Sequence, residues 1–188
     1  MKKNDLTKIN LSHKDDLLIQ SYFTIAFLTE LKNLNFLDSE PYKILPFQDK
    51  FIQDSLPTIG IDNRGALLIF LYALLVLPKE QYKFTALEKK LNDIDKKIKP
   101  LVYKEISNYA RDIKNNKLNI QYIYHIRNSI AHGKIQFNNN LVIFKDINTR
   151  VKKGLPNEEC QIEIPQANIG KIIHELQFVI IEYLKSKN

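Results

Sequence analysis

The stretch HIRNSIAHGKIQF, residues 125–137, holds three side chains whose types together could cut a phosphodiester: Arg127, Asn128 and His132. Histidine accepts or releases a proton near neutral pH. Arginine is permanently charged and pairs with phosphate oxygens, while an asparagine amide offers one acceptor and two donors that can orient a neighbour. These roles suffice for metal-free RNA cleavage, in which a 2′-hydroxyl attacks its own phosphodiester and leaves a 2′,3′-cyclic phosphate and a 5′-hydroxyl.

Helical spacing does not place the arginine and the histidine on one face. Five residues at about 100° each separate Arg127 and His132 by about 140° around an ideal helix. Two features could still bring them together. Gly133 can close the helix in a left-handed conformation and let the last turn reorganise around His132. A two-fold dimer could also place this helix end from both chains in one composite site.

Two other interpretations of the same residues stay open. Arg127 and Asn128 could face solvent while His132 only closes the helix, where a cation favours the helix dipole. His125 and His132 form an H-x6-H pair, but no carboxylate or cysteine stands near them in the sequence to complete a metal site. We therefore expect no metal and no cofactor.

Residues around this stretch are candidates for RNA contact. A tyrosine beside the motif could stack on a base, and lysines or arginines could contact phosphates. The candidates are Tyr124, His125, Lys134, Arg150, Lys152 and Lys153.

Composition limits the class of protein. The 188 residues carry 28 Lys+Arg and 21 Asp+Glu, a net charge of +7 that favours approach to a polyanion. The one cysteine, Cys160, excludes an internal disulfide and a multi-cysteine metal site. The N-terminus lacks the apolar core of a signal peptide, and the apolar run Ala66–Leu77 is too short to cross a bilayer. We expect one domain, residues 1–188, in the cytoplasm without membrane contact.

Periodicity predicts a mainly helical chain. Apolar spacing predicts helices over about 13–34 and 47–55, from Asp62 or Asn63 to Pro78, and over 120–131 with Asn119 as the cap. TALE, residues 85–88, opens a charged helix that Pro100 breaks or kinks.

The pattern changes after the motif. KIQFNNNLVIFKDI, residues 134–147, reads as a hairpin turning at asparagines, and CQIEIP, residues 160–165, could be a third short strand. An amphipathic helix follows from residue 166 or 167. The predicted fold is mainly α, with a small β-hairpin inserted before the C-terminal helix.

RNSIAH, residues 127–132, resembles the R-x(4–6)-H motif of the HEPN superfamily, which also has a polar residue directly after the arginine. NRGALLIFLYALLVLPKE, residues 63–80, and IRNSIAHGKIQF with LVIFKD resemble the bacterial pEK499 p136-like HEPN subgroup, so the similarity covers most of the chain.

The resemblance implies a dimeric HEPN-like helical bundle. Many such proteins are metal-independent endoribonucleases that act as toxins or in antiviral or stress defence. Carried onto this chain, Arg127 and His132 would be catalytic and Asn128 would support them. The implied partners are an RNA substrate, a second copy and, for a toxin, an antitoxin protein. Some relatives are inactive, so the alternative is a non-catalytic helical module that binds nucleic acid or a protein partner.

Overall fold

The computed structural model describes residues 13–78, 86–149 and 156–186. More of these residues lie in helices than in strands. The mainly α class is therefore confirmed. The longer helices are α1 (His13–Asn33), α3 (Lys50–Ile59), α4 (Arg64–Leu71), α6 (Ala86–Asp93), α8 (Tyr122–Ala131) and α9 (Gln166–Lys185). The shorter helical pieces are η1 (Phe36–Asp38), α2 (Glu40–Lys43), the π-helical η2 (Tyr72–Val76), α7 (Asp95–Ile98), η3 (Lys99–Leu101) and η4 (Ala110–Asp112).

Most predicted helices begin and end near the expected residues. Asn63 caps α4, where its Oδ1 accepts a hydrogen bond from the Ala66 N–H at 3.0 Å. The apolar run then continues through η2 to Pro78, with most of its residues buried or half-buried and with Ile69 and Tyr72 exposed. α6 begins at Ala86, but the proposed capping residue Thr85 lies outside the described residues. Pro100 lies in η3, so the charged helix breaks there as expected.

The β structure is larger than the predicted hairpin. Strands β4 (Ile135–Asn138) and β5 (Leu141–Asn148) form that hairpin, with Asn139 in the left-handed region at φ 51°. β6 (Glu158–Pro165) and β1 (Lys104–Ser107) extend it to a four-stranded antiparallel sheet in the order β1-β6-β5-β4. A separate two-stranded ladder joins β2 (Ile113–Lys114) and β3 (Lys117–Leu118). The predicted hairpin and the predicted strand over residues 160–165 are both present. The pairing of β1 with β6 was not predicted, because the two strands lie more than fifty residues apart and local patterning does not reveal such a contact.

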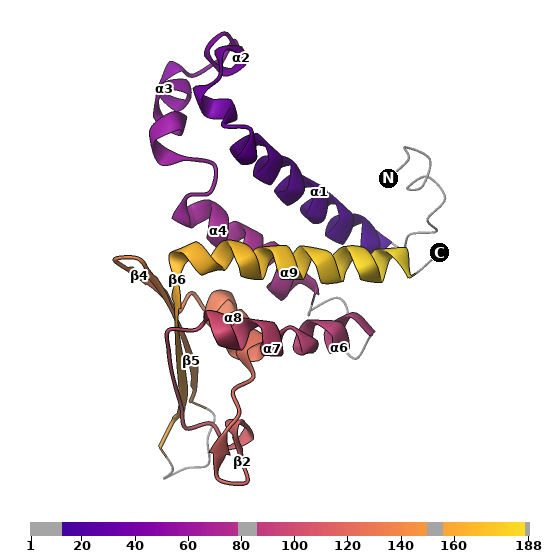
Figure 1. Cartoon of the computed structure of the whole chain (residues 1–188), viewed down its shortest axis with the longest axis vertical. Coiled ribbons are helices and arrows are strands. Elements are labelled where there is room, and N and C mark those ends of the chain that lie inside the picture. Colours follow the sequence, from indigo (N-terminus) through magenta and orange to yellow (C-terminus); the bar gives the residue numbers. More distant parts are fainter. Residues whose placement is uncertain (1–12, 79–85, 150–155, 187–188) are drawn as a thin grey trace.

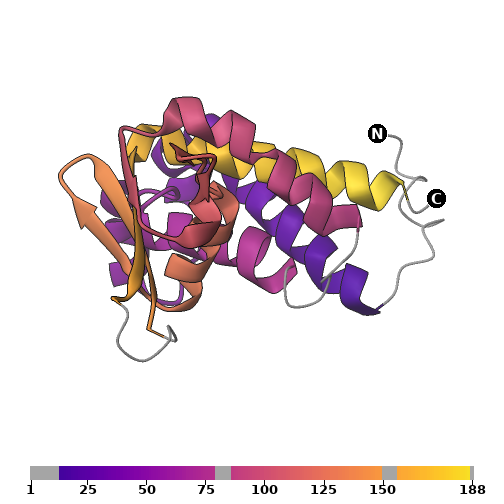
Figure 2. The same cartoon turned by 90° about the horizontal axis from the view of Figure 1, so that it is seen from below.

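Helix α8 lies between the sheet and the other helices. One face of β5 carries Val142, Phe144 and Asp146 inward, and α8 packs against this face with the fully buried Ile126. On its other side α8 meets η2, while α9 packs along α1, α4 and α6. Figure 2 shows the strands gathered at one end of the molecule, with α1, α6 and α9 extending away from them.

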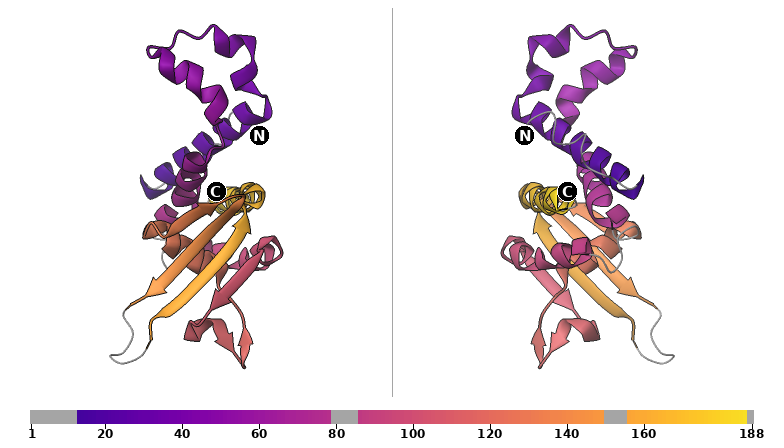
Figure 3. Two further views of the ribbon diagram at one scale, coloured as in Figure 1. Left: turned by 90° about the vertical axis from the view of Figure 1, so that its left-hand side faces the viewer. Right: turned by 90° about the vertical axis from the view of Figure 1, so that its right-hand side faces the viewer.

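Residues 34–59, which we call the arm, stand at the opposite end of the molecule from the sheet. They comprise η1, α2 and α3, and α9 runs between the arm and the sheet (Figures 1 and 3). Among the described residues no single helix has the length and apolar character to cross a membrane. Within the same described ranges, one bent pair of helices meets both criteria together: α3 and Arg64–Val76, which lie at 83° to each other.

The N-terminus of α8 is capped by a distant carboxylate. Asp95 Oδ1 accepts a hydrogen bond from the Ile123 N–H at 2.7 Å. The predicted cap, Asn119, is wrong: α8 starts at Tyr122, and the Asn119 N–H donates to the Asp112 carbonyl instead. Burial raises the pKa of Asp95 to about 6, against the lowering effects of the Ile123 hydrogen bond and the His125 charge.

We predict that Asp95→Asn makes the protein more stable at pH 7.5. A carboxyl whose pKa is raised on folding contributes its stability below its unfolded pKa and loses it as the pH rises through about 6. Asparagine keeps an acceptor for the Ile123 N–H without a charge. We expect a gain of about 1–2 kcal/mol at pH 7.5 and a difference under about 0.5 kcal/mol at pH 4, measured by urea unfolding with far-UV CD. An equal effect at both pH values would contradict the charge-burial account.

Candidate active site

The end of α8 turns the chain sharply and leaves His132 in solvent. His132 is the C-cap residue, with φ −102° and ψ 7°, and Gly133 follows in the left-handed region at φ +63°. The Lys134 N–H then donates to the Ser129 carbonyl at 2.8 Å, which closes the helix in the way that a C-terminal glycine favours. Both His132 and Lys134 are exposed.

A cleft of about 690 Å³ opens beside this helix end. Its lining includes all three predicted catalytic residues, Arg127, Asn128 and His132, together with Lys134 and Lys145. Within a single chain the cleft therefore brings Arg127 and His132 to one place, although they lie on different sides of the helix. Since His132 leaves the helical path at the cap, the cleft can curve around the helix end and meet both side chains.

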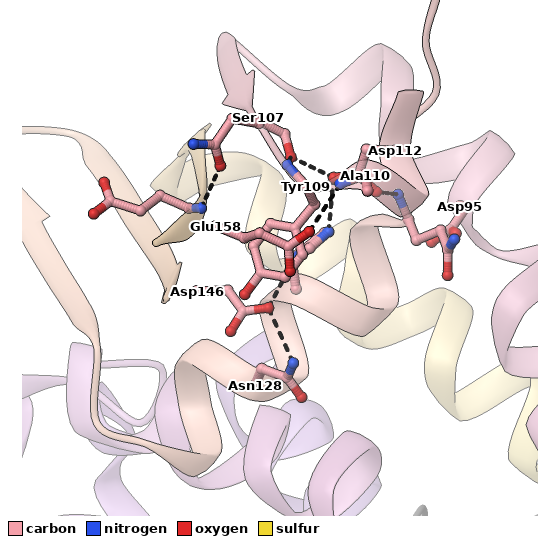
Figure 4. A network of polar contacts seen from close by, with 12 residues as sticks. Asp95, Ser107, Tyr109, Ala110, Asp112, Asn128, Asp146 and Glu158 are labelled. Carbon is pink, nitrogen blue, oxygen red and sulfur yellow. Dashed lines mark hydrogen bonds and ion pairs between the residues drawn. The ribbon is translucent and has the colours of Figure 1, made fainter. Parts of the chain in front are cut away.

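Arg127 is held in place by a chain of hydrogen bonds that leads into the core. Its side chain is 9% exposed, and Nη2 donates to Asn128 Oδ1 at 2.7 Å. Asn128 Nδ2 in turn donates to Asp146 Oδ2 at 3.0 Å. The Arg127 guanidinium also lies 5.1 Å from the centre of the Tyr124 ring. Asn128 thus links the guanidinium to Asp146, which holds the Asn128 amide in place (Figure 4).

His125 is not an RNA contact, contrary to the prediction. Its side chain is 1% exposed. Nδ1 lies 2.7 Å from Asp146 Oδ2, and Nε2 lies 2.9 Å from Asp112 Oδ2, so each ring nitrogen is within hydrogen-bond distance of a buried carboxylate. The ring therefore bridges two aspartates inside the protein. The sequence around His125 does not indicate this role, because both aspartates lie far from it along the chain.

The carboxylates around His125 are well supplied with donors. Burial alone would raise the pKa of Asp146, but hydrogen bonds from His125, Asn128 and Tyr109 and the charge of His125 outweigh it and lower that pKa. Burial and the nearby Asp146 raise the pKa of Tyr109, so its hydroxyl keeps its proton as a donor. Asp112 accepts from Ser107 as well as His125 (Figure 4).

One buried group has the donor atoms of a metal site. Asp112, His125 and Cys160 place ligand atoms within 4.8 Å of one another. No carboxylate or cysteine stands beside His125 in the sequence, but the fold brings Asp112 and Cys160 next to it. Both His125 nitrogens already bind carboxylates, and burial raises the pKa of the Cys160 thiol to about 12. As found, this cluster is arranged as an ion pair with a protonated thiol beside it.

The other predicted contacts have different outcomes. Tyr124 and Lys134 line the cleft. Arg150, Lys152 and Lys153 lie outside the described residues. Sequence reasoning missed Lys145 in the cleft wall and Arg111, whose guanidinium lies 3.9 Å from the Tyr124 ring centre.

The position of Asp146 in the strand pattern indicates a buried carboxylate, although the sequence analysis did not include it. It occupies the same strand face as Val142 and Phe144, a position where a carboxylate must find buried partners. Asp112, in the short η4 turn, gives no comparable pattern.

Comparison with known families finds a match over nearly the whole chain. A sequence model described as HEPN pEK499 p136 matches residues 1–187. The chain belongs to this HEPN family. The subgroup expected from RNSIAH and residues 63–80 is thereby confirmed. No curated protein and no solved structure matches the chain.

We predict that His125→Ala severely destabilises this HEPN protein. Removing the ring leaves Asp112 and Asp146 buried without their shared partner, and removing one member of a buried charged pair costs about 3–5 kcal/mol. Urea unfolding followed by far-UV CD measures the loss. The matched control is His174→Ala, because His174 is exposed on α9, and we expect a change within about 0.5 kcal/mol. Similar stabilities for the two variants would contradict the ion-pair assignment.

Proposed function

We propose that this HEPN protein is a metal-independent endoribonuclease whose site is the cleft at the end of α8. Family membership supports a nuclease or nucleotide-binding role. The observation that carries the proposal is the presence of Arg127, Asn128 and His132 in the wall of one cleft. Lys134 and Lys145 in the same wall add positive charge that suits a polyanionic substrate.

The proposed reaction divides roles between the exposed His132 and the largely buried Arg127. His132 removes the proton from a 2′-hydroxyl, whose oxygen then bonds to the adjacent phosphorus. The bond from phosphorus to the 5′-oxygen breaks, and that oxygen takes a proton. Arg127 neutralises the charge that builds on the phosphorus oxygens, and Asn128 keeps the guanidinium oriented. The products are a 2′,3′-cyclic phosphate and a 5′-hydroxyl.

A two-fold dimer would supply the second proton-transfer group. In a composite site His132 of one protomer acts as the base, and the same residue of its partner protonates the leaving oxygen. The exposure of His132 is compatible with such a shared site, because a buried histidine could not reach a second chain. We further propose a cytoplasmic toxin or a role in antiviral or stress defence, with RNA as substrate and an antitoxin as protein partner of a toxin.

One observation favours a second candidate, a non-catalytic module that binds nucleic acid or a protein partner. Arg127 is largely buried, and its Nη2 already donates to Asn128. A guanidinium in this state has fewer free N–H groups for a phosphate than an open one. A binding module would use the exposed Lys134 and the cleft surface without bond cleavage.

We predict that wild-type protein cleaves RNA in EDTA and that His132→Ala or Arg127→Ala reduces the rate at least about 100-fold. Asn128→Ala should lose less, since it acts by orienting Arg127. Gel assays on labelled RNA measure the rates, with His174→Ala as the matched histidine control. Far-UV CD checks that each variant is folded.

Two results would contradict the nuclease. One is cleavage that persists unchanged in both variants, and the other is cleavage that requires an added divalent metal. RNA binding without cleavage, equal in wild type and His132→Ala, would instead support the binding module. Growth arrest on expression, relieved by His132→Ala, would support the toxin role.

A further inference from the structure

Strand β5 has an open edge inside the cleft. β6 pairs with β5 along its whole length, Leu141–Asn148, but β4 pairs only with Leu141–Phe144. The last contact on the β4 side is the Lys145 N–H, which donates to the Lys134 carbonyl at 2.9 Å. On the N-terminal side of Lys134 the chain belongs to the end of α8, so β5 and β6 continue together past β4 (Figure 3). Residues 145–149 consequently form one wall of the cleft.

Ile147 presents its backbone to this open edge. Hydrogen bonds of a strand in an antiparallel sheet alternate between its two neighbours. Since Lys145 bonds toward β4, Ile147 faces the same side, at a level that β4 does not reach. Over the ranges that the structure describes, the Ile147 N–H and carbonyl have no hydrogen-bond partner, and the residue is 39% exposed. Such an edge is a template for an additional extended strand.

A peptide suits the backbone of Ile147 better than RNA does. The N–H and the carbonyl offer one donor and one acceptor on the same side of the strand. A residue of an antiparallel peptide pairs with both at once. A phosphate oxygen only accepts, so it would bind the N–H and leave the carbonyl unpaired beside an anion.

Positive charge in the cleft wall indicates which side chains the peptide carries. Arg127, Lys134 and Lys145 line the cleft. Among the described lining residues Asp146 is the one carboxylate, and it is buried, with Oδ2 already hydrogen-bonded to neighbouring side chains. Glu158 on β6 lies outside this lining, and nearby donors bind its carboxylate too. Three cations against one buried carboxylate favour acidic side chains in a ligand.

The two faces of β5 set the positions of these acidic side chains. Asp146 and Asn148 point to the α8 side of the sheet. Arg127 and His132 line the cleft on that side, whereas Ile147 points to the other side. A peptide residue directly opposite Ile147 shares its face, so an apolar side chain fits there. The residues before and after it point toward Arg127 and His132, where acidic side chains fit.

We propose that the open edge of β5 is a peptide-binding site. An extended segment of a protein partner, in which acidic and apolar residues alternate, adds to this edge as an antiparallel strand in the place that a longer β4 would fill. The inference does not rest on RNA cleavage. A segment bound there covers Arg127 and His132 and therefore excludes RNA from the proposed nuclease site, and this consequence alone rests on the proposed function.

The test measures binding of fluorescein-labelled peptides to the full chain by fluorescence anisotropy. The probe is a peptide of about eight residues in which glutamate and valine alternate, and we expect saturable binding with a Kd below about 100 µM. N-methylation of the valines removes the N–H groups that face β5 and should raise the Kd at least about 10-fold. N-methylation of the glutamates removes N–H groups of the opposite edge and should change the Kd less than about 2-fold.

Two variants at one position test the protein side. Ile147→Pro removes the N–H that faces the open edge, where proline breaks no hydrogen bond of the sheet, and should raise the Kd at least about 10-fold. Ile147→Val keeps that N–H and a β-branched side chain, and should leave the Kd within about 2-fold. Far-UV CD checks that both variants are folded, and the N-methylated peptides test the edge on wild type if the proline variant is not.

Several results would overturn the peptide site. They are no binding of the glutamate–valine peptide to wild type, equal Kd values for the two N-methylated peptides, and unchanged binding by folded Ile147→Pro. A short single-stranded RNA that loses affinity as much as the peptide does in Ile147→Pro would also overturn it, because the edge would then bind nucleic acid. Peptide binding by a protein that does not cleave RNA contradicts only the nuclease, whereas RNA cleavage without peptide binding contradicts only this site.

Discussion

The buried ion-pair cluster of His125 with Asp112 and Asp146 connects every element that shapes the candidate site. His125 comes from α8, Asp112 from η4 and Asp146 from β5, so one ring ties three segments of the chain together. Charges this far from water are tolerated only when each finds its partners, and here both ring nitrogens and both carboxylates do. Because Asp146 also accepts from Asn128, the same cluster fixes the amide that holds Arg127.

This arrangement gives the two proposed catalytic side chains different physical characters. Arg127 is largely buried and is anchored through Asn128 to the core. His132 lies past the last turn of α8, exposed beside Gly133, with nothing comparable holding it. A fixed cation with an accessible proton carrier is what transition-state charge stabilisation combined with general base catalysis requires. The sheet serves this site by holding Asp146 under α8.

Sequence patterning predicted the parts of the fold that local rules decide. α1, α8 and α9 follow apolar spacing, Asn63 caps α4, and Gly133 ends α8, so their positions need only neighbouring residues. β1 and the Asp95 cap of α8 depend on partners far along the chain. His125 was misassigned for the same reason, since its partners Asp112 and Asp146 become visible only in three dimensions. The three motif residues line one cleft within a single chain, although helical spacing alone separates Arg127 from His132. The hydrogen bond from Asn128 to Asp146 was not predicted.

In the proposed function, the residues at the end of α8 catalyse the attack of an RNA 2′-hydroxyl on the adjacent phosphodiester. The most direct measurement is the chemistry of the RNA ends produced by wild-type protein in EDTA. The account predicts 2′,3′-cyclic phosphate and 5′-hydroxyl ends, and no such products from His132→Ala. Fragments with 5′-phosphate and 3′-hydroxyl ends, or cyclic phosphate ends formed equally by His132→Ala, would contradict it.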